Sequence, residues 1–172
     1  MLALRDARSE EIALIQAIEL AAAGRYASVG MAQIAAGDPV PSAVLAARIE
    51  SGNLIVAAAA DDLLIGFVVF RPLEGAAYIE EVDVLPAHAG RRIGAALLDE
   101  AARRAAVRGL DALTLSTFRH VPWNAPYYRR LGFRELADAE LTPGLRAVRA
   151  DNVARGLDET QRCFMRRPIG AA

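Results

Sequence analysis

One stretch of the chain decides the fold, Val82-Asp-Val-Leu-Pro-Ala-His-Ala-Gly-Arg-Arg-Ile-Gly-Ala-Ala-Leu-Leu98. An alternating apolar run ends at Pro86, a short loop follows, and a helical pattern starts at once. A helix N-terminus leaves backbone N–H groups unpaired and carries partial positive charge, which suits a phosphate group. Gly90 lets the backbone approach a ligand closely, and Arg91 and Arg92 add positive charge. The residues alone favour a phosphate-binding loop over an ordinary strand-loop-helix joint.

The pattern of apolar residues around this stretch predicts helices first, then a run of antiparallel strands, and then alternating helices and strands. The predicted helices span residues 9–22, 26–36, 42–50, 90–108, 126–130 and 141–157. The predicted strands span residues 53–60, 63–70, 76–85, 110–117, 133–137 and 161–166. We expect Ser9 to cap the first helix, Gly24 to end it, and Asn124 to open the short helix near its cap. This order predicts one α/β (α+β) domain with a mixed, largely antiparallel sheet.

Composition excludes several classes of protein. The chain of 172 residues fits one ordinary domain, and its net charge of −1 gives no electrostatic case for nucleic acid. We find no apolar run near the roughly 20 residues that a membrane span needs, and the charged N-terminus does not fit a secretion signal. A cytoplasmic protein without membrane or nucleic-acid partners is therefore expected. One cysteine, Cys163, and two distant histidines, His88 and His120, predict no disulfide and no metal site.

A second informative stretch, Trp123-Asn-Ala-Pro-Tyr-Tyr-Arg-Arg-Leu-Gly-Phe133, follows one predicted strand later. Together the two stretches resemble the GNAT superfamily of N-acetyltransferases. The first is similar to that family's pyrophosphate loop, Gln/Arg-x-x-Gly-x-Gly/Ala, with Ala89 and Arg92 departing from the usual Gln or Arg and the usual first glycine. The second is similar to its Asn…Tyr-x-x-x-Gly-Phe signature, with Tyr128 four residues before Gly132.

The resemblance implies a fold, a cosubstrate and a set of site residues. The implied GNAT fold makes residues 1–172 a single N-acetyltransferase domain, with six or seven strands flanked by about four helices. Acetyl-CoA is the implied cosubstrate, with its pyrophosphate at the loop and its pantetheine arm along the preceding strand like an added strand. Tyr128 is the implied acid that protonates the departing thiolate. The implied cofactor-binding residues are Val82, Asp83, Val84, Ala89, Gly90, Arg91, Arg92, Ile93, Gly94, Ala95, Asn124 and Tyr128.

Acetyl transfer to an amine also needs a group that removes a proton. Glu81 and Asp83 alternate with two valines, so the two carboxylates share one face of the strand. If the valines face the core, the carboxylates face the substrate and Glu81 is the candidate general base, directly or through a water. Glu80, Asp83, His120 and water stay open as alternatives for the base. Solvated strand acids without a catalytic role are the remaining interpretation.

The expected reaction is direct transfer from acetyl-CoA to a primary amine, because Cys163 lies away from both stretches and offers no acyl-enzyme. We expect a small-molecule amine, and the carboxylates favour a cationic one. The alternatives are a peptide or protein acetyltransferase, acting on an N-terminus or a lysine, and a non-catalytic acyl-CoA-binding module. Residues 24–45 are expected to shape the acceptor pocket. The insertion over 142–156 is a candidate for the acceptor wall or for a homodimer contact.

Overall fold

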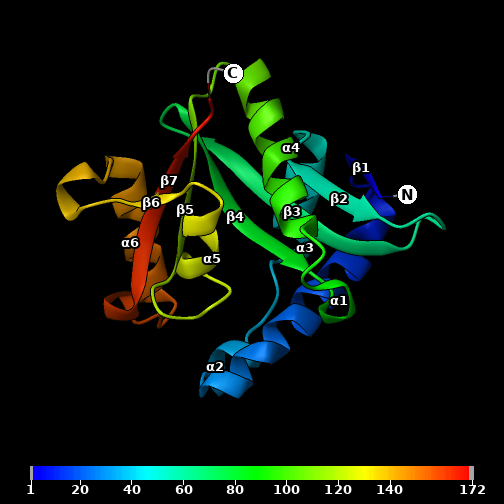
Figure 1. Cartoon of the computed structure of the whole chain (residues 1–172), viewed down its shortest axis with the longest axis horizontal. Coiled ribbons are helices and arrows are strands. Elements are labelled where there is room, and N and C mark those ends of the chain that lie inside the picture. Colours follow the sequence, from blue (N-terminus) through cyan, green and yellow to red (C-terminus); the bar gives the residue numbers. More distant parts are fainter. Residues whose placement is uncertain (1, 171–172) are drawn as a thin grey trace. The chain divides into compact units, whose positions relative to one another are not determined.

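The computed structural model describes residues 2–170, which contain seven strands and six α-helices (Figure 1). The strands are β1 (Ala3–Asp6), β2 (Leu54–Ala58), β3 (Leu64–Leu73), β4 (Ala76–Val84), β5 (Ala112–Phe118), β6 (Arg134–Glu135) and β7 (Arg162–Pro168). The α-helices are α1 (Ile12–Ala23), α2 (Ala32–Ala35), α3 (Ser42–Glu50), α4 (Ile93–Val107), α5 (Ala125–Arg130) and α6 (Pro143–Ala154). Short 3-10 helices are η1 (Ser9–Glu11), η2 (Gly24–Val29), η3 (Pro86–His88), η4 (Asp138–Glu140) and η5 (Glu159–Gln161).

The strands form one hydrogen-bonded sheet in the order β1-β2-β3-β4-β5-β7-β6. The pair β4–β5 is parallel, whereas β1–β2, β2–β3, β5–β7 and β6–β7 are antiparallel. This confirms the expected mixed, mostly antiparallel sheet. In the described chain four helices have at least nine residues, as expected, and the two others, α2 and α5, have 4 and 6 residues.

The chain folds as two compact units. The first, here called the N-terminal unit, contains the chain up to Arg71 together with Glu80–Ala101. The second, the C-terminal unit, contains Pro72–Ile79 and the chain from Ala102 onward. The strand β4 and the helix α4 each contribute residues to both units, so the two units are not separate lengths of sequence.

The core of the N-terminal unit lies where α1 and α3 contact β2 and β3. Ile15, Leu45 and Phe67 have no exposed surface there, and burying each such side chain contributes roughly 1.5–3 kcal/mol. The first predicted helix therefore contributes Ile15 to this core. The strand β1 was not predicted, because its four residues carry no clear alternation and become a strand by pairing with β2.

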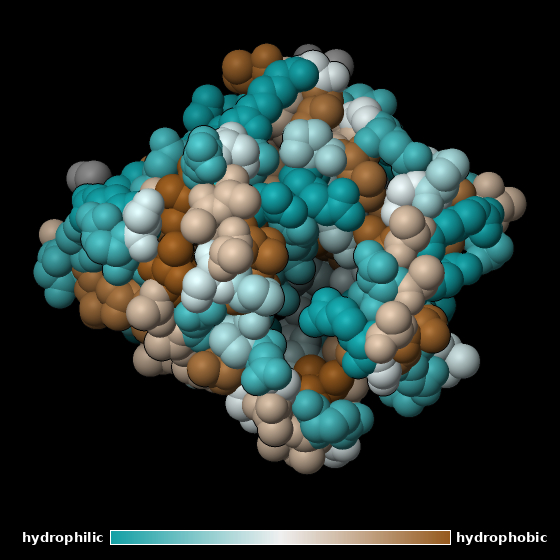
Figure 2. Space-filling view, turned by 180° about the vertical axis from the view of Figure 1, so that it is seen from behind, coloured by the Kyte–Doolittle hydropathy of each residue, from teal (hydrophilic) through white to brown (hydrophobic). Residues whose placement is uncertain are grey.

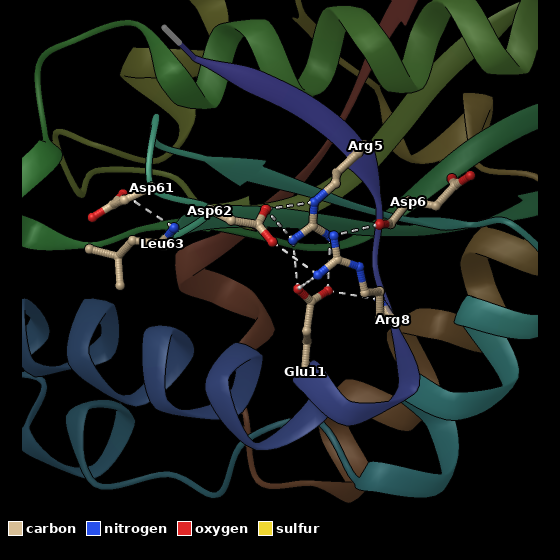
Figure 3. A network of polar contacts seen from close by, with 7 residues as sticks. All are labelled: Arg5, Asp6, Arg8, Glu11, Asp61, Asp62 and Leu63. Carbon is tan, nitrogen blue, oxygen red and sulfur yellow. Dashed lines mark hydrogen bonds and ion pairs between the residues drawn. The ribbon is translucent and has the colours of Figure 1, made fainter.

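The start of the first helical segment differs from the prediction. Ser9 is the first residue of η1, and Arg8 occupies the N-cap position. The Glu11 carboxylate replaces the expected serine cap, because it accepts the Arg8 backbone N–H at 2.8 Å and two N–H groups of Arg5 at 2.6 and 3.0 Å. Asp62, at the β2–β3 turn, accepts from both arginines at 2.8–3.1 Å (Figure 3). The α-helix α1 ends at Ala23 with Gly24 at its C-cap position, as expected, and because Gly24 keeps right-handed angles the chain continues directly as the 3-10 helix η2.

One long apolar segment is not an uninterrupted apolar run, because charged residues divide it. Ser9–Val29 has 21 residues and contains an 18-residue window with a mean hydropathy of 1.2, enough in length and composition alone to cross a membrane. The charged residues do not lower the mean hydropathy of that window below the level typical of a membrane span. Ile15 and Ile18 of this segment belong to the packed core of the N-terminal unit, although only 17% of its apolar window is buried. Figure 2 shows hydrophobic residues interspersed with hydrophilic ones on the face it displays.

The C-terminal unit holds the predicted insertion as helix α6. Thr142 caps α6 by accepting the Leu145 backbone N–H at 3.3 Å, and Pro143 occupies the first turn, where it needs no N–H partner. The helix packs Leu145 against Tyr78 and Phe164 in a buried apolar cluster. The predicted strand over 133–137 shrinks to the two residues of β6. The predicted helix over 26–36 is split into η2 and the single turn α2.

Candidate functional site

The loop between β4 and α4 has the backbone shape that a phosphate-binding loop requires. Gly90 has φ 75° and Arg92 has φ 59°, both in the left-handed region. An added Cβ at Gly90 would meet no atom within 4 Å, so glycine is favoured there by backbone conformation and not by crowding. Arg92 occupies the position where the family pattern has glycine, and its left-handed angle explains that pattern.

The side chains of this loop and of the first turn of α4 point in different directions. Ala89, Gly90, Arg91 and Arg92 are exposed, whereas the side chains of Ile93 and Ala95 are buried at 5% exposure each. Gly94 lies between them in the same turn. A ligand at the helix start would therefore meet backbone N–H groups and the two exposed arginines.

Gly66 is a residue of this site that sequence reasoning missed. It lies in β3, where an added Cβ would come within 2.8 Å of the Asp83 carbonyl oxygen and 3.2 Å of a Val84 methyl group. The neighbouring Ile65 carbonyl accepts the Leu85 N–H at 2.9 Å, which holds the end of β4 against β3. An isolated glycine inside a strand pattern signals a close backbone approach, and that signal was present in the sequence.

The candidate base Glu80 is held by arginines. Arg48 of α3 donates to both its carboxylate oxygens, at 2.6 and 2.9 Å, and Arg71 lies 3.4 Å away. Both guanidiniums belong to the N-terminal unit, where Arg48 ties α3 to β4 and Arg71 of β3 lies against the same carboxylate. A carboxylate engaged in this way is a structural anchor, which weakens its candidacy as a base.

Asp83 differs most from its predicted environment. We expected the valines to face the core and the carboxylates to face the substrate, but Val82 and Val84 are partly exposed and Asp83 is 9% exposed. Arg25 of η2 lies beside it, with Nη2 3.8 Å from the Asp83 Oδ1. Burial raises the pKa of Asp83 well above its ordinary value, the charge of Glu81 raises it further, and Arg25 opposes the shift. Glu81 itself is partly buried.

The second signature forms a compact turn in the C-terminal unit. Tyr128 of α5 is 9% exposed and packs edge-to-face on Phe133, with ring centroids 5.5 Å apart. Gly132 has φ 86°, and the Phe133 N–H donates to the Tyr128 carbonyl at 3.1 Å, so the glycine closes the helix. Asn124 occupies the N-cap position, as predicted, but its side chain makes no cap. Instead it donates to the Thr117 hydroxyl of β5 at 2.7 Å.

The remaining sequence candidates lie outside these clusters. His120 is exposed on the loop after β5. Cys163 is buried in β7, and burial raises the pKa of its thiol, which makes it a poor nucleophile. Among residues 2–170, no group of three or more His, Cys, Asp and Glu side chains is placed to hold a metal ion.

A family model described as "Acetyltransferase (GNAT) family" matches residues 16–133, which include β4, the loop that follows it and α5. The chain belongs to this family. The match confirms the resemblance carried by the two signatures, and it covers more than half of the chain.

Solved acetyltransferase structures share the GNAT fold of this chain. One is the N-acetylglutamate synthase from Neisseria gonorrhoeae complexed with coenzyme A and N-acetyl-glutamate, with a TM-score of 0.74, 17% identity and 99% of this chain covered. This chain spans 35% of that synthase. The PaiA N-acetyltransferase from Thermoplasma acidophilum in complex with coenzyme A has a TM-score of 0.68, 17% identity, and coverage of 98% and 99%. The ribosomal-protein-S18-alanine N-acetyltransferase from Escherichia coli has a TM-score of 0.65, 16% identity, and coverage of 100% and 96%.

Proposed function

We propose that this chain transfers an acetyl group from acetyl-CoA directly to a primary amine of a small molecule. Membership of an acetyltransferase family supports the reaction type, and two of the fold relatives were solved with coenzyme A. The observation that carries the proposal is the loop before α4, where Gly90 and Arg92 both adopt left-handed angles. This backbone shape leads into a helix start whose N–H groups suit the pyrophosphate.

The strand β4 supports the rest of the cosubstrate site. Its parallel ladder with β5 covers Ala76, Ala77 and Tyr78, so the backbone of Val82–Val84 lies beyond that ladder. In the proposal this backbone pairs with the pantetheine arm like an added strand, and one amide N–H polarises the thioester carbonyl. Asn124 lies at the start of α5, the helix that carries Tyr128, and its hydrogen bond to Thr117 attaches that helix to β5.

The proposed chemistry assigns one proton to each of two side chains. The protonated amine first gives one proton to Glu81, directly or through a water, and its neutral nitrogen then attacks the thioester carbon as the carbon–sulfur bond breaks. Tyr128 gives its hydroxyl proton to the departing thiolate. The second proton, lost by the nitrogen as the amide forms, restores the tyrosine hydroxyl. Asp83 is the positioning residue: it lies buried beside Arg25, and in its ionised form its negative charge attracts a cationic amine.

An acceptor panel tests the proposal. Release of free thiol from acetyl-CoA is measured with a cationic diamine, a neutral aromatic amine and a short peptide at low and high ionic strength. The cationic diamine is expected to give the highest kcat/KM. Added salt should lower that value, since the screening length falls from about 30 Å at 0.01 M to about 8 Å at 0.15 M.

Tyr128→Phe is the matched variant for this assay, because it keeps the ring packing on Phe133 and removes only the hydroxyl. Its kcat should fall by roughly 10²–10⁴-fold while the acetyl-CoA affinity stays unchanged. Preference for the peptide would reassign the chain to the protein acetyltransferases, and a neutral amine preferred at both ionic strengths would refute the charged acceptor. Thiol release with none of the amines would leave the non-catalytic acyl-CoA-binding module.

A further inference from the structure

A row of cross-strand neighbours in the C-terminal unit brings two arginines together. Tyr78 of β4 lies opposite Thr114 of β5, Thr114 lies opposite Arg166 of β7, and Arg166 lies opposite Arg134 of β6. Residues directly opposite one another point to the same face of a sheet. Like charges in that relation destabilise the sheet, so Arg134 and Arg166 need negative charge close by.

Arg134 and Arg166 each have an acidic partner, but the two arginines are not paired equally well. Arg134 makes a two-pronged ion pair with Glu140, at 2.8 and 3.1 Å. Arg166 donates one hydrogen bond, from Nη2 to Asp111 at 2.9 Å, although a guanidinium carries five N–H donors. Its side chain is one-third exposed. Arg166 is therefore the arginine with capacity for a further acceptor.

A pocket of about 220 Å³ opens over this row. Thr114, Arg134 and Arg166 line it on the strand side, and Leu73, Leu136 and Leu145 supply an apolar wall. A water molecule takes about 30 Å³ in the liquid, so the space suits a small organic molecule better than a single ion. None of its lining residues belongs to the loop before α4, to the 81–84 segment or to α5.

Thr114 provides an independent sign of a ligand. The residue is 3% exposed, and its hydroxyl oxygen is buried without a hydrogen-bond partner among the described residues. Burying a hydroxyl without a partner is costly, and native proteins rarely leave one in that state. A polar group in the pocket would satisfy it. The hydroxyl can donate to an anionic oxygen while Arg166 donates to the same group.

We propose that this pocket binds a small carboxylic acid, with its carboxylate on Arg166 and Thr114 and its apolar body against Leu73, Leu136 and Leu145. Two carboxylates, Glu74 and Glu140, also line the space. They would repel a dianion such as phosphate more strongly than a monoanion. The apolar wall likewise favours an alkyl chain over a compact inorganic ion.

Titration of the full chain with butyrate tests this proposal, with the neutral isostere butyramide and inorganic phosphate as comparison ligands. Butyrate should bind, and butyramide and phosphate should each bind at least about tenfold more weakly. Thr114→Val preserves the shape and removes the unpartnered hydroxyl, so the melting temperature should not fall while butyrate affinity drops about three- to tenfold. Arg166→Gln should weaken binding by tenfold or more. Arg155→Gln, at an exposed arginine that does not line the pocket, should leave the affinity unchanged.

Several outcomes would overturn the assignment. They are the absence of saturable butyrate binding up to about 50 mM, equal binding of butyramide, tighter binding of phosphate, and undiminished butyrate affinity in Thr114→Val. Should Arg166→Gln fail to fold, the threonine variant decides alone, because it replaces a hydroxyl that makes no hydrogen bond in the protein. Acetyl transfer does not enter the readout, so the result stands whether or not the proposed function holds.

Discussion

At the scale of single residues, the buried carboxyl of Asp83 lowers the stability of the fold but lies where a functional group is expected. A buried carboxyl with one guanidinium 3.8 Å away pays for desolvation that the ion pair offsets only in part. The residue is nevertheless an acid, where leucine or valine would pack without that cost. Strongly perturbed carboxyls of this kind cluster at functional sites, which supports a role beside Glu81.

Asp83→Asn should reveal that cost through its dependence on pH. The pKa of Asp83 is raised in the folded chain, so the protonated acid stabilises the fold below its ordinary pKa, and this contribution is lost as pH rises through the raised value. The asparagine variant, which cannot ionise, should therefore melt higher than the wild type at pH 8 and differ little at pH 4. Thermal unfolding of both proteins across that range measures the effect. A difference independent of pH would show that the pKa of Asp83 is the same in the folded and the unfolded chain.

At the scale of elements, most of the helices and strands follow from local pattern, and the exceptions depend on distant partners. The alternation in β4 and the proline after it are local signals, and the structure has them as predicted. The burial of Asp83 depends on Arg25, 58 residues earlier, and the strand β1 depends on β2. Such contacts leave no periodic trace, so they could not be predicted from the sequence.

The loop before α4 offers a test in which stability and binding change separately. A non-glycine residue in the left-handed region costs about 1–2 kcal/mol, and Arg92 sits there. Arg92→Gly should raise the free energy of unfolding by roughly 1 kcal/mol and weaken acetyl-CoA binding only through the lost charge. Arg92→Ala, which loses the same charge but keeps the strained angle, should bind equally weakly without the gain in stability. Denaturant unfolding and ligand titration compare the two variants, and equal stabilities would contradict the strain argument.

At the scale of the whole molecule, cosubstrate binding should appear as thermal stabilisation. A ligand that binds only the folded chain adds about 2.7 kcal/mol at one hundred times its Kd, which for a chain of this length raises Tm by roughly 5–10 °C. Acetyl-CoA should produce this shift, whereas acetyl-pantetheine, which lacks the pyrophosphate, should produce much less. Differential scanning fluorimetry makes the comparison. Equal shifts with both ligands would show that the loop before α4 does not hold the pyrophosphate.

The ionic cluster around Glu11 also bears on association between copies of the protein. The strand β1 is the edge strand of the sheet. Its hydrogen-bonded neighbour, β2, is the wholly buried run Leu54-Ile-Val-Ala-Ala58. Arg5 fastens β1 in place by bonding Glu11 on one side and Asp62 on the other. Without these ion pairs, β1 would detach more easily and expose the edge of β2. A strand of a neighbouring chain would then be able to pair with that edge, which is the first step of aggregation. The ion pairs of Arg5 with Glu11 and Asp62, although worth little to stability alone, therefore oppose such pairing between chains.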